Sequence, residues 1–153
     1  MPLWLEGRCL ELGTPTGYAP FVDILREYLA WRPEQEEHRR RESIVYALRR
    51  MVERGTLAQE RVQEIGPLLG RLLSVRWGAD AHHADEWDDR LERESAEQIR
   101  NRTFAALYDL LLALSTQRPV VLVFEDLHWA DTLSLDLISL LMEGLPQQRL
   151  LLM

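Results

Sequence analysis

The chain has 153 residues, of which 46% are apolar and 28% are charged, so it is long enough for one modest domain with its own core. Its net charge of −7 argues against a nucleic-acid-binding face, which needs clustered cations. The apolar runs are too short to cross a bilayer and the N-terminus lacks the pattern of a signal peptide, so we expect a cytoplasmic segment that binds neither membrane nor nucleic acid.

Residues 1–33 predict a strand followed by a helix. Apolar side chains between Leu3 and Leu12 indicate the strand, and Cys9 is interpreted as one of its small buried residues. The Gly- and Pro-containing residues 13–17 predict a loop. A helix is expected to begin near Pro20, because proline suits the first helical turn, and to end near Trp31-Arg32-Pro33.

Residues 34–95 predict short polar helices. One apolar stripe is formed by residues at helical spacing, namely Ile44, Leu48, Met51 and Val52. Gly66-Pro67 is predicted to break the chain, and residues 76–90 are predicted to form a loop. That loop holds His82, His83, Asp85 and Glu86, whose spacing matches no standard zinc site, so a polar surface is the favoured interpretation.

Residues 96–153 predict a helix, a strand, a second helix and a final strand. The first helix carries Phe104, Leu107, Leu111 and Leu114 on one face and ends at Arg118-Pro119. The continuous apolar run Val120–Phe124 is typical of a central parallel strand that is covered on both faces. Leucines from Leu133 to Leu141 predict the next helix, and residues 149–153 begin another strand.

This order of elements predicts an α/β fold with a parallel sheet of about three strands, flanking helices and a mostly helical insertion. The last strand reaches the end of the sequence, which leads us to expect that the chain is a fragment of a larger domain. Open sheet edges in such a fragment predict marginal stability and self-association. A sharply cooperative, monomeric unfolding transition would contradict that expectation.

Two adjacent acids follow the most apolar strand. In a parallel α/β sheet, ligands gather at the carboxyl ends of the strands, where Glu125 and Asp126 are expected to lie. Carboxylates suit Mg²⁺, and a second acid can orient or deprotonate a water that attacks a phosphate. An apolar strand that ends in two acids is the Walker B pattern, although a strand that simply surfaces at a loop gives the same string.

The longer string Glu125-Asp126-Leu127-His128-Trp129-Ala130-Asp131, with the leucine-spaced helix after it, resembles the Walker B segment of the STAND class of AAA-like ATPases (signal-transduction ATPases with numerous domains). Gly7-Arg8-Cys9 and Tyr18-Ala19-Pro20-Phe21 also resemble this family. Its members occur in bacterial regulators with LuxR-type DNA-binding ends or adenylate cyclase domains. The resemblance covers nearly all of residues 1–153, in three parts: 1–33, 34–95, and 96–153.

The resemblance implies a partial P-loop NTPase-type fold and an ATP site with Mg²⁺. Glu125 takes the position of the magnesium-associated acid, and Asp126 takes that of the catalytic, water-activating acid that also contacts nucleotide and metal. Here the order is Glu-Asp rather than the common Asp-Glu, so the shorter catalytic side chain reaches less far. His128 is a candidate nucleotide contact, with a local hydrogen bond as its alternative. Trp129 is expected to pack on a neighbouring helix, and Asp131 is predicted to cap the leucine-rich helix that follows.

The family's phosphate loop is missing from this chain. That loop ends in Gly-Lys-Ser/Thr, whereas all 18 cations of this sequence are arginine. We therefore expect nucleotide binding, and contacts with the other domains of a parent regulator, only in an intact protein. Two alternatives stay open. One is a degenerate, non-catalytic interaction module, and the other is an unrelated α/β enzyme that uses Glu125 and Asp126 as an acid/base pair.

Overall fold

The computed structural model describes residues 1–11, 17–77, 84–144 and 148–153, with backbone alone for 84–88. These residues form an α/β structure with three parallel strands and six α-helices, which confirms the predicted fold class. The chain divides into two compact units. The first unit comprises residues 1–31 and 111–153, and the second comprises residues 32–110. No helix among the described residues combines the length and apolar content that a membrane crossing requires.

The sheet of the first unit has the order β1-β2-β3, with β1 at Leu3–Arg8, β2 at Val120–Glu125 and β3 at Leu150–Leu152. The central strand β2 buries most of its apolar side chains, as the sequence predicted for a covered strand. Leu3 pairs with Val120, and this register continues until Arg8 pairs with Glu125. The carboxyl ends of β1 and β2 therefore lie side by side.

Strand β1 is shorter than the predicted Leu3–Leu12. Its last ladder bond runs from the Cys9 amide to the Glu125 carbonyl at 3.0 Å, where β2 also ends. Beyond that point the chain has no strand to pair with, and Leu10 is exposed. Cys9 itself is buried, as predicted, although it follows the strand rather than lying within it.

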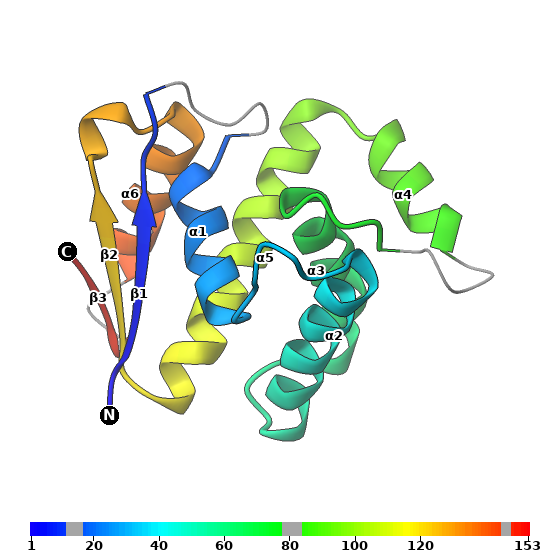
Figure 1. Ribbon diagram of the computed structural model, residues 1–153, viewed down its shortest axis with the longest axis horizontal. Helices are drawn as coiled ribbons and strands as arrows, with labels where there is room; N and C mark the ends of the chain where they lie inside the picture. The colour runs from blue at the N-terminus through cyan, green and yellow to red at the C-terminus, as the bar shows by residue number, and fades with distance from the viewer. Residues whose placement is uncertain (12–16, 78–83, 145–147) are drawn as a thin grey trace. The chain divides into compact units, whose positions relative to one another are not determined.

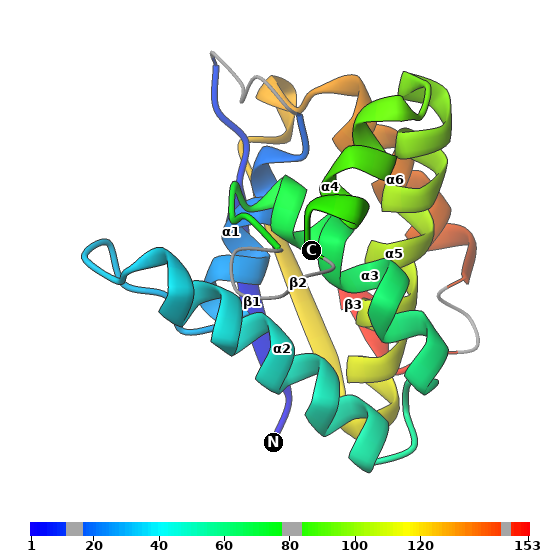
Figure 2. The same ribbon diagram turned by 90° about the vertical axis from the view of Figure 1, so that its right-hand side faces the viewer.

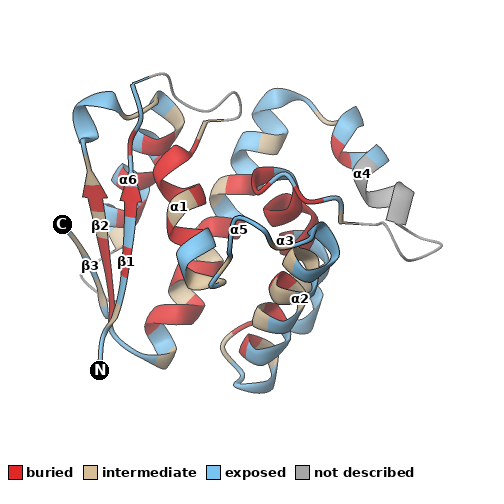
Figure 3. Cartoon of the chain, viewed as in Figure 1, coloured by how far each residue is buried: buried red, intermediate tan, exposed pale blue. Residues whose placement is uncertain are grey.

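Helix α1 (Ala19–Tyr28) covers one side of the sheet and begins with the predicted proline (Figure 1). The Phe21 and Phe124 rings pack with their centroids 5.3 Å apart, and the buried residues of α1 and β2 are red in Figure 3. Gly7 permits this close packing, because a Cβ there would lie 2.2 Å from the Pro20 carbonyl oxygen. The helix start is thus held directly against the end of β1.

Carboxylates of α1 also complete the hydrogen bonding of β1. The Glu6 amide donates to Glu27 at 2.7 Å, and the Arg8 amide donates to Asp23 at 3.3 Å. These two amides belong to the side of β1 that no strand pairs with in the observed sheet. The helix therefore satisfies donors at a strand edge, which fixes the backbone around Arg8.

Two further helices come before and after the central strand in the chain. Helix α5 (Ala96–Gln117) ends just before Arg118-Pro119, as predicted, and helix α6 (Thr132–Gly144) follows β2. The guanidinium of Arg149 donates to the Ser115 and Thr116 carbonyl oxygens, at 3.2 and 2.5 Å. A cation at the carboxyl end of a helix satisfies its free carbonyls and complements its dipole, so Arg149 ties α5 to the start of β3.

The second unit is helical, as predicted. It contains α2 (Glu37–Glu53), α3 (Gln59–Leu72), α4 (Ala84–Arg93) and the first part of α5. Figure 2 shows α2 and α3 as neighbours, and both contribute fully buried side chains such as Ile44, Leu48 and Ile65. Arg61 of α3 holds Asp109 of α5 through two hydrogen bonds, at 2.6 and 2.9 Å.

Two predictions for this unit are wrong. Gly66-Pro67 does not break the chain, because α3 runs through Pro67. Residues 65–70 are buried, and a Cβ at Gly66 would lie 2.2 Å from the Trp77 ring. Burial against Trp77 outweighs the local cost of the proline, which lies in the range of about 3 kcal/mol. Residues 84–93, assigned in part to a loop, are helix α4.

Candidate functional site

Three charged side chains meet where β1 and β2 end. Glu125 is the last residue of β2, Asp126 follows it, and Arg8 is the last residue of β1. The Glu125 Oε2 atom accepts hydrogen bonds from Arg8 Nη2 at 2.6 Å and from Arg8 Nε at 3.1 Å. Arg8 Nε also lies 3.8 Å from Asp126 Oδ2. One guanidinium group therefore bridges both predicted Walker B acids.

The register of the sheet explains this meeting. Paired residues of neighbouring strands project to the same face, so the side chains of Arg8 and Glu125 lie together, and Glu6 lies two residues earlier on that face. The side chains stay accessible, with Arg8 59% exposed, Glu125 38% and Asp126 50%. The group is therefore open to a ligand from solvent.

The charges of these groups shift one another's pKa values. The hydrogen bond and charge of Arg8 lower the pKa of Glu125, and the hydrogen bond with Glu125 raises the pKa of Arg8. The charge of Glu125 raises the pKa of Glu6, since two nearby carboxylates disfavour joint ionisation. Glu125 is thus ionised beside a second acid, and the site favours a bound cation.

The backbone turns sharply at Asp126. This residue has φ 56° and ψ 42°, in the left-handed region, and the 3₁₀ turn η1 (Leu127–Trp129) begins immediately after it. The Asp126 carbonyl accepts a hydrogen bond from the Trp129 amide at 2.8 Å. Aspartate tolerates this conformation better than most residues. The turn stops the chain from continuing β2 and leaves the Asp126 carboxylate at the sheet edge.

The turn presents its side chains to solvent. His128 is exposed, and its ring lies 5.1 Å from that of Trp129, at 47°. Trp129 is 44% exposed, and its predicted packing on a neighbouring helix stays a prediction. His128 lies three residues beyond Glu125 in the chain. Its predicted nucleotide contact stays a prediction.

Asp131 caps α6, as the sequence predicted. Its Oδ1 accepts from the Ser134 amide at 2.9 Å, and its Oδ2 accepts from the Ser134 hydroxyl at 2.7 Å. A further hydrogen bond comes from the Tyr18 backbone, just before α1. Burial raises the pKa of Asp131, but these hydrogen bonds outweigh it and leave the pKa below its usual value. Asp131 therefore links the starts of α1 and α6.

Comparison with protein families decides the assignment. A model of the AAA ATPase domain family matches residues 2–153, nearly the whole chain. The chain belongs to the AAA ATPase domain family. Comparisons with the curated proteins and with the solved structures found no match.

As an AAA ATPase domain, the chain has a donor set that fits Mg²⁺. Members of such a nucleotide-binding family generally use ATP with Mg²⁺. Mg²⁺ is usually held by one or two protein carboxylates together with phosphate oxygens and water. Glu125 and Asp126 supply two accessible carboxylates, and a guanidinium already lies against both. Residues 1–11, 17–77, 84–144 and 148–153 hold no cluster of three or more metal-ligating side chains, so the pair offers two carboxylates without a third protein ligand.

Sequence reasoning did not predict that Arg8 contacts the acidic pair in this AAA ATPase domain. The residue entered the argument through the string Gly7-Arg8-Cys9 alone, and it lies 117 positions from Glu125. Its place at the carboxyl end of β1 was a usable signal, because parallel strands end at the same sheet edge. Which strands are neighbours was not readable from the sequence.

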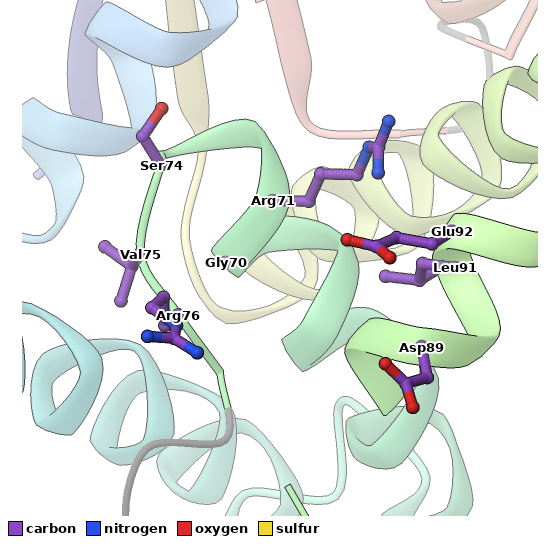
Figure 4. Close-up of a pocket in the computed structure, with 8 residues that line it drawn as sticks. All are labelled: Gly70, Arg71, Ser74, Val75, Arg76, Asp89, Leu91 and Glu92. Carbon is purple, nitrogen blue, oxygen red and sulfur yellow. The ribbon is translucent and has the colours of Figure 1, made fainter. Parts of the chain in front are cut away.

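Two other regions are separate from this site. His82 and His83 lie outside the described residues, as do the side chains of Asp85 and Glu86 and the predicted loop at 13–16. In the second unit, a depression of about 420 Å³ lies between α3, the segment after it and α4 (Figure 4). Arg71 and Arg76 line it together with Asp89 and Glu92. Its mixed charge indicates no particular ligand.

Proposed function

We propose that Glu125 and Asp126 form the magnesium side of an ATP site in a regulatory ATPase. The observation that carries this proposal is the bridging of both accessible carboxylates by one guanidinium at the end of the central buried strand. One or two carboxylates beside phosphate oxygens are the usual protein ligands of Mg²⁺, and the contact with Arg8 shows that this pair attracts positive charge. Membership of the AAA ATPase domain family supports ATP as the nucleotide.

The two acids have different roles in this proposal. Glu125 contacts the metal, because its carboxylate projects from the end of the strand on the accessible face. Asp126 orients the attacking water and accepts its proton, from a backbone position fixed by the left-handed turn. Bound Mg²⁺ would neutralise charge on the phosphates. His128 contributes a polar ring at the rim, as a nucleotide contact.

The phosphate-binding lysine does not come from these residues. The sequence contains no lysine and no Gly-rich loop of the Gly-Lys-Ser/Thr type. Backbone amides and that lysine supply most of the phosphate contacts in such sites. We therefore propose that the 153-residue chain by itself binds ATP too weakly to measure in the micromolar range, and that an intact protein supplies the missing contacts.

The resemblance to STAND-class regulators gives the proposed biological role. In such a protein, ATP binding and hydrolysis would switch an assembly, or a transcription or signalling output, through the other domains of the parent regulator. The partners proposed for this segment are consequently nucleotide and neighbouring domains of the same protein, within the cytoplasm.

The test compares matched carboxylate variants in the intact protein. Glu125→Gln and Asp126→Asn keep side-chain size, and asparagine also tolerates the left-handed backbone at position 126. Each is expected to lower the ATP hydrolysis rate about 10²- to 10³-fold, the usual effect of losing a group that stabilises the reaction. Glu143→Gln, an exposed acid near the end of α6, serves as the control and is expected to leave the rate unchanged. Unchanged hydrolysis in Glu125→Gln would refute the proposal.

A second candidate, a non-catalytic interaction module, is favoured by the absence of lysine. The coding DNA upstream of Met1 separates the two. An in-frame Gly-rich loop with a lysine supports the ATPase, whereas a stop codon close upstream supports the module. Micromolar ATP binding by the 153-residue chain would contradict both the module and the proposed weakness of binding.

A further inference from the structure

Arg8 occupies the position where a cation would approach the acidic pair. Both of its hydrogen bonds to Glu125 end on one oxygen, Oε2, at 2.6 and 3.1 Å, and its Nε also faces Asp126. A Mg²⁺ ion needs direct approach to a carboxylate oxygen at about 2.1 Å. The guanidinium and the metal cannot both take the same direction of approach to this oxygen.

The surroundings allow Arg8 to leave. Its side chain is 59% exposed, so release into solvent costs little burial. Its backbone, by contrast, is held by the pairing with β2 and by the hydrogen bond to Asp23. The backbone of Arg8 is thus held in place while its exposed guanidinium can move. The guanidinium stays near the acids whether or not it is hydrogen-bonded to them.

The charges around Arg8 are mainly acidic. Glu6 lies on its own strand, Asp23 and Glu27 come from α1, and Glu125 and Asp126 come from the end of β2. Without the guanidinium, the carboxylates of Glu6 and Glu125 would face each other with less compensation. Arg8 is therefore the counter-charge of this acidic group.

We propose that Arg8 is a built-in competitor of Mg²⁺ for Glu125 and Asp126, so that metal binding requires its guanidinium to swing away. This inference rests on the proposed function, because it assumes that the acidic pair binds a metal. It assigns to Arg8 the regulation of metal affinity at that site.

The size of the effect follows from the exposure of the pair. An exposed ion pair changes an equilibrium constant by a factor of about 1.4 to 5. The repulsion between Arg8 and a divalent ion adds a further factor, up to about 5 for each unit of the ion's charge in water at 4 Å, which salt screening and the movement of Arg8 reduce. We expect removal of the positive charge to tighten divalent-metal binding about 3- to 10-fold.

The experiment measures Mn²⁺ binding to the 153-residue chain by the decrease of the free-ion EPR signal. Mn²⁺ prefers the same oxygen ligands as Mg²⁺. Arg8→Gln is compared with Arg8→Lys, which keeps the charge, and with Arg39→Gln. Arg39 lies on α2 in the second unit with an exposed side chain, so its variant has the same net-charge change on residues outside the acidic group. Circular dichroism of each variant verifies folding, and Glu125→Gln verifies the place of binding.

The proposal predicts that Arg8→Gln binds Mn²⁺ about 3- to 10-fold more tightly than the natural chain, while Arg8→Lys and Arg39→Gln stay within twofold. If Arg8→Gln binds Mn²⁺ with the same affinity as the natural chain, or more weakly, the competition is overturned. The proposed metal site is still supported in that case when Glu125→Gln abolishes Mn²⁺ binding. Metal binding that is unaffected by Glu125→Gln overturns both the competition and the proposed metal site. Metal binding that is absent from every variant, Arg8→Gln included, overturns the competition.

A second readout uses the natural chain alone. The Arg8 Nε–H group donates to Glu125, so its ¹H–¹⁵N NMR signal reports on that bond. Saturating Mg²⁺ is expected to move this signal towards the position of a solvated arginine. Arg149, which bonds backbone carbonyls at the end of α5, provides the control signal and is expected to stay in place. A stationary Arg8 signal on a metal-saturated chain contradicts the proposal.

Discussion

Replacing Asp131 with alanine is expected to destabilise the fold without touching the acidic pair. The change removes the acceptors of the Ser134 amide and hydroxyl, at 2.9 and 2.7 Å. Loss of an N-cap to alanine costs about 0.5–2 kcal/mol. Ser134 is 0% exposed, and a buried polar group left without its partner costs about 1–3 kcal/mol. We expect a total loss of about 2–3 kcal/mol for Asp131→Ala, and about 1 kcal/mol for Asp131→Asn, which keeps an acceptor.

The assay is urea unfolding at pH 7, followed by circular dichroism at 222 nm. Asp136→Ala, at an exposed position of the same helix, controls for the change in helix propensity and is expected to stay within about 0.5 kcal/mol of the natural chain. An Asp131→Ala variant as stable as Asp136→Ala would refute the capping role.

The pH dependence gives an independent test of the same residue. The folded pKa of Asp131 lies below its unfolded value of about 3.9, so the ionised form is the one that stabilises. Its contribution is fully present above the unfolded pKa and is lost as the pH falls through the folded pKa. The stability difference between the natural chain and Asp131→Asn should hold from pH 7 to about 5 and shrink below about 4. A difference that grows on acidification would contradict this.

Two more predictions concern buried packing. Gly66→Ala should destabilise the chain by about 1–2 kcal/mol and change the tryptophan fluorescence, because the new methyl group meets the Trp77 ring. The control is Gln63→Ala at an exposed position of the same helix, whose free energy of unfolding should stay within about 0.5 kcal/mol of that of the natural chain. Equal stability of the two would contradict the contact. Burial raises the pKa of the Cys9 thiol, so iodoacetamide at pH 8 should modify it at least about tenfold more slowly in the folded chain than in urea, and equal rates would contradict its burial.

The fold was predictable wherever a local signal coincided with burial. The apolar run Val120–Phe124 became the central strand, and Arg118-Pro119 ended α5, because proline lacks the amide that a helix needs. The same rule failed at Gly66-Pro67. There the deciding contact is with Trp77, and no local rule reveals that an indole ring will lie against a glycine. Tertiary packing overrode a strong helix breaker.

The sequence predicted the acidic residues of the candidate site but not their cationic partner. Glu125 and Asp126 are adjacent to each other and to their strand, so a short string was enough to identify them. Their cationic partner was not predictable, because the Arg8–Glu125 contact depends on β1 and β2 being neighbours in a defined register. A slip of one residue would place Arg8 on the opposite face of the sheet. The position of Arg8 therefore depends on how the strands pair in the sheet, whereas the two acids are adjacent in one segment of the sequence.

Asp126 and Asp131 lie at the two ends of the turn after β2, and their carboxylates differ in how many hydrogen bonds they already accept. Both oxygens of Asp131 accept hydrogen bonds from Ser134, so this carboxylate has little capacity left for a ligand. Asp126 is half-exposed, and its contact with Arg8 is long, at 3.8 Å. A metal ligand or a base needs an oxygen with capacity for a further contact, which the half-exposed Asp126 offers more readily than Asp131, whose two oxygens already accept hydrogen bonds from Ser134. Substitution at Asp131 should therefore act through stability, and substitution at Asp126 through metal and nucleotide chemistry.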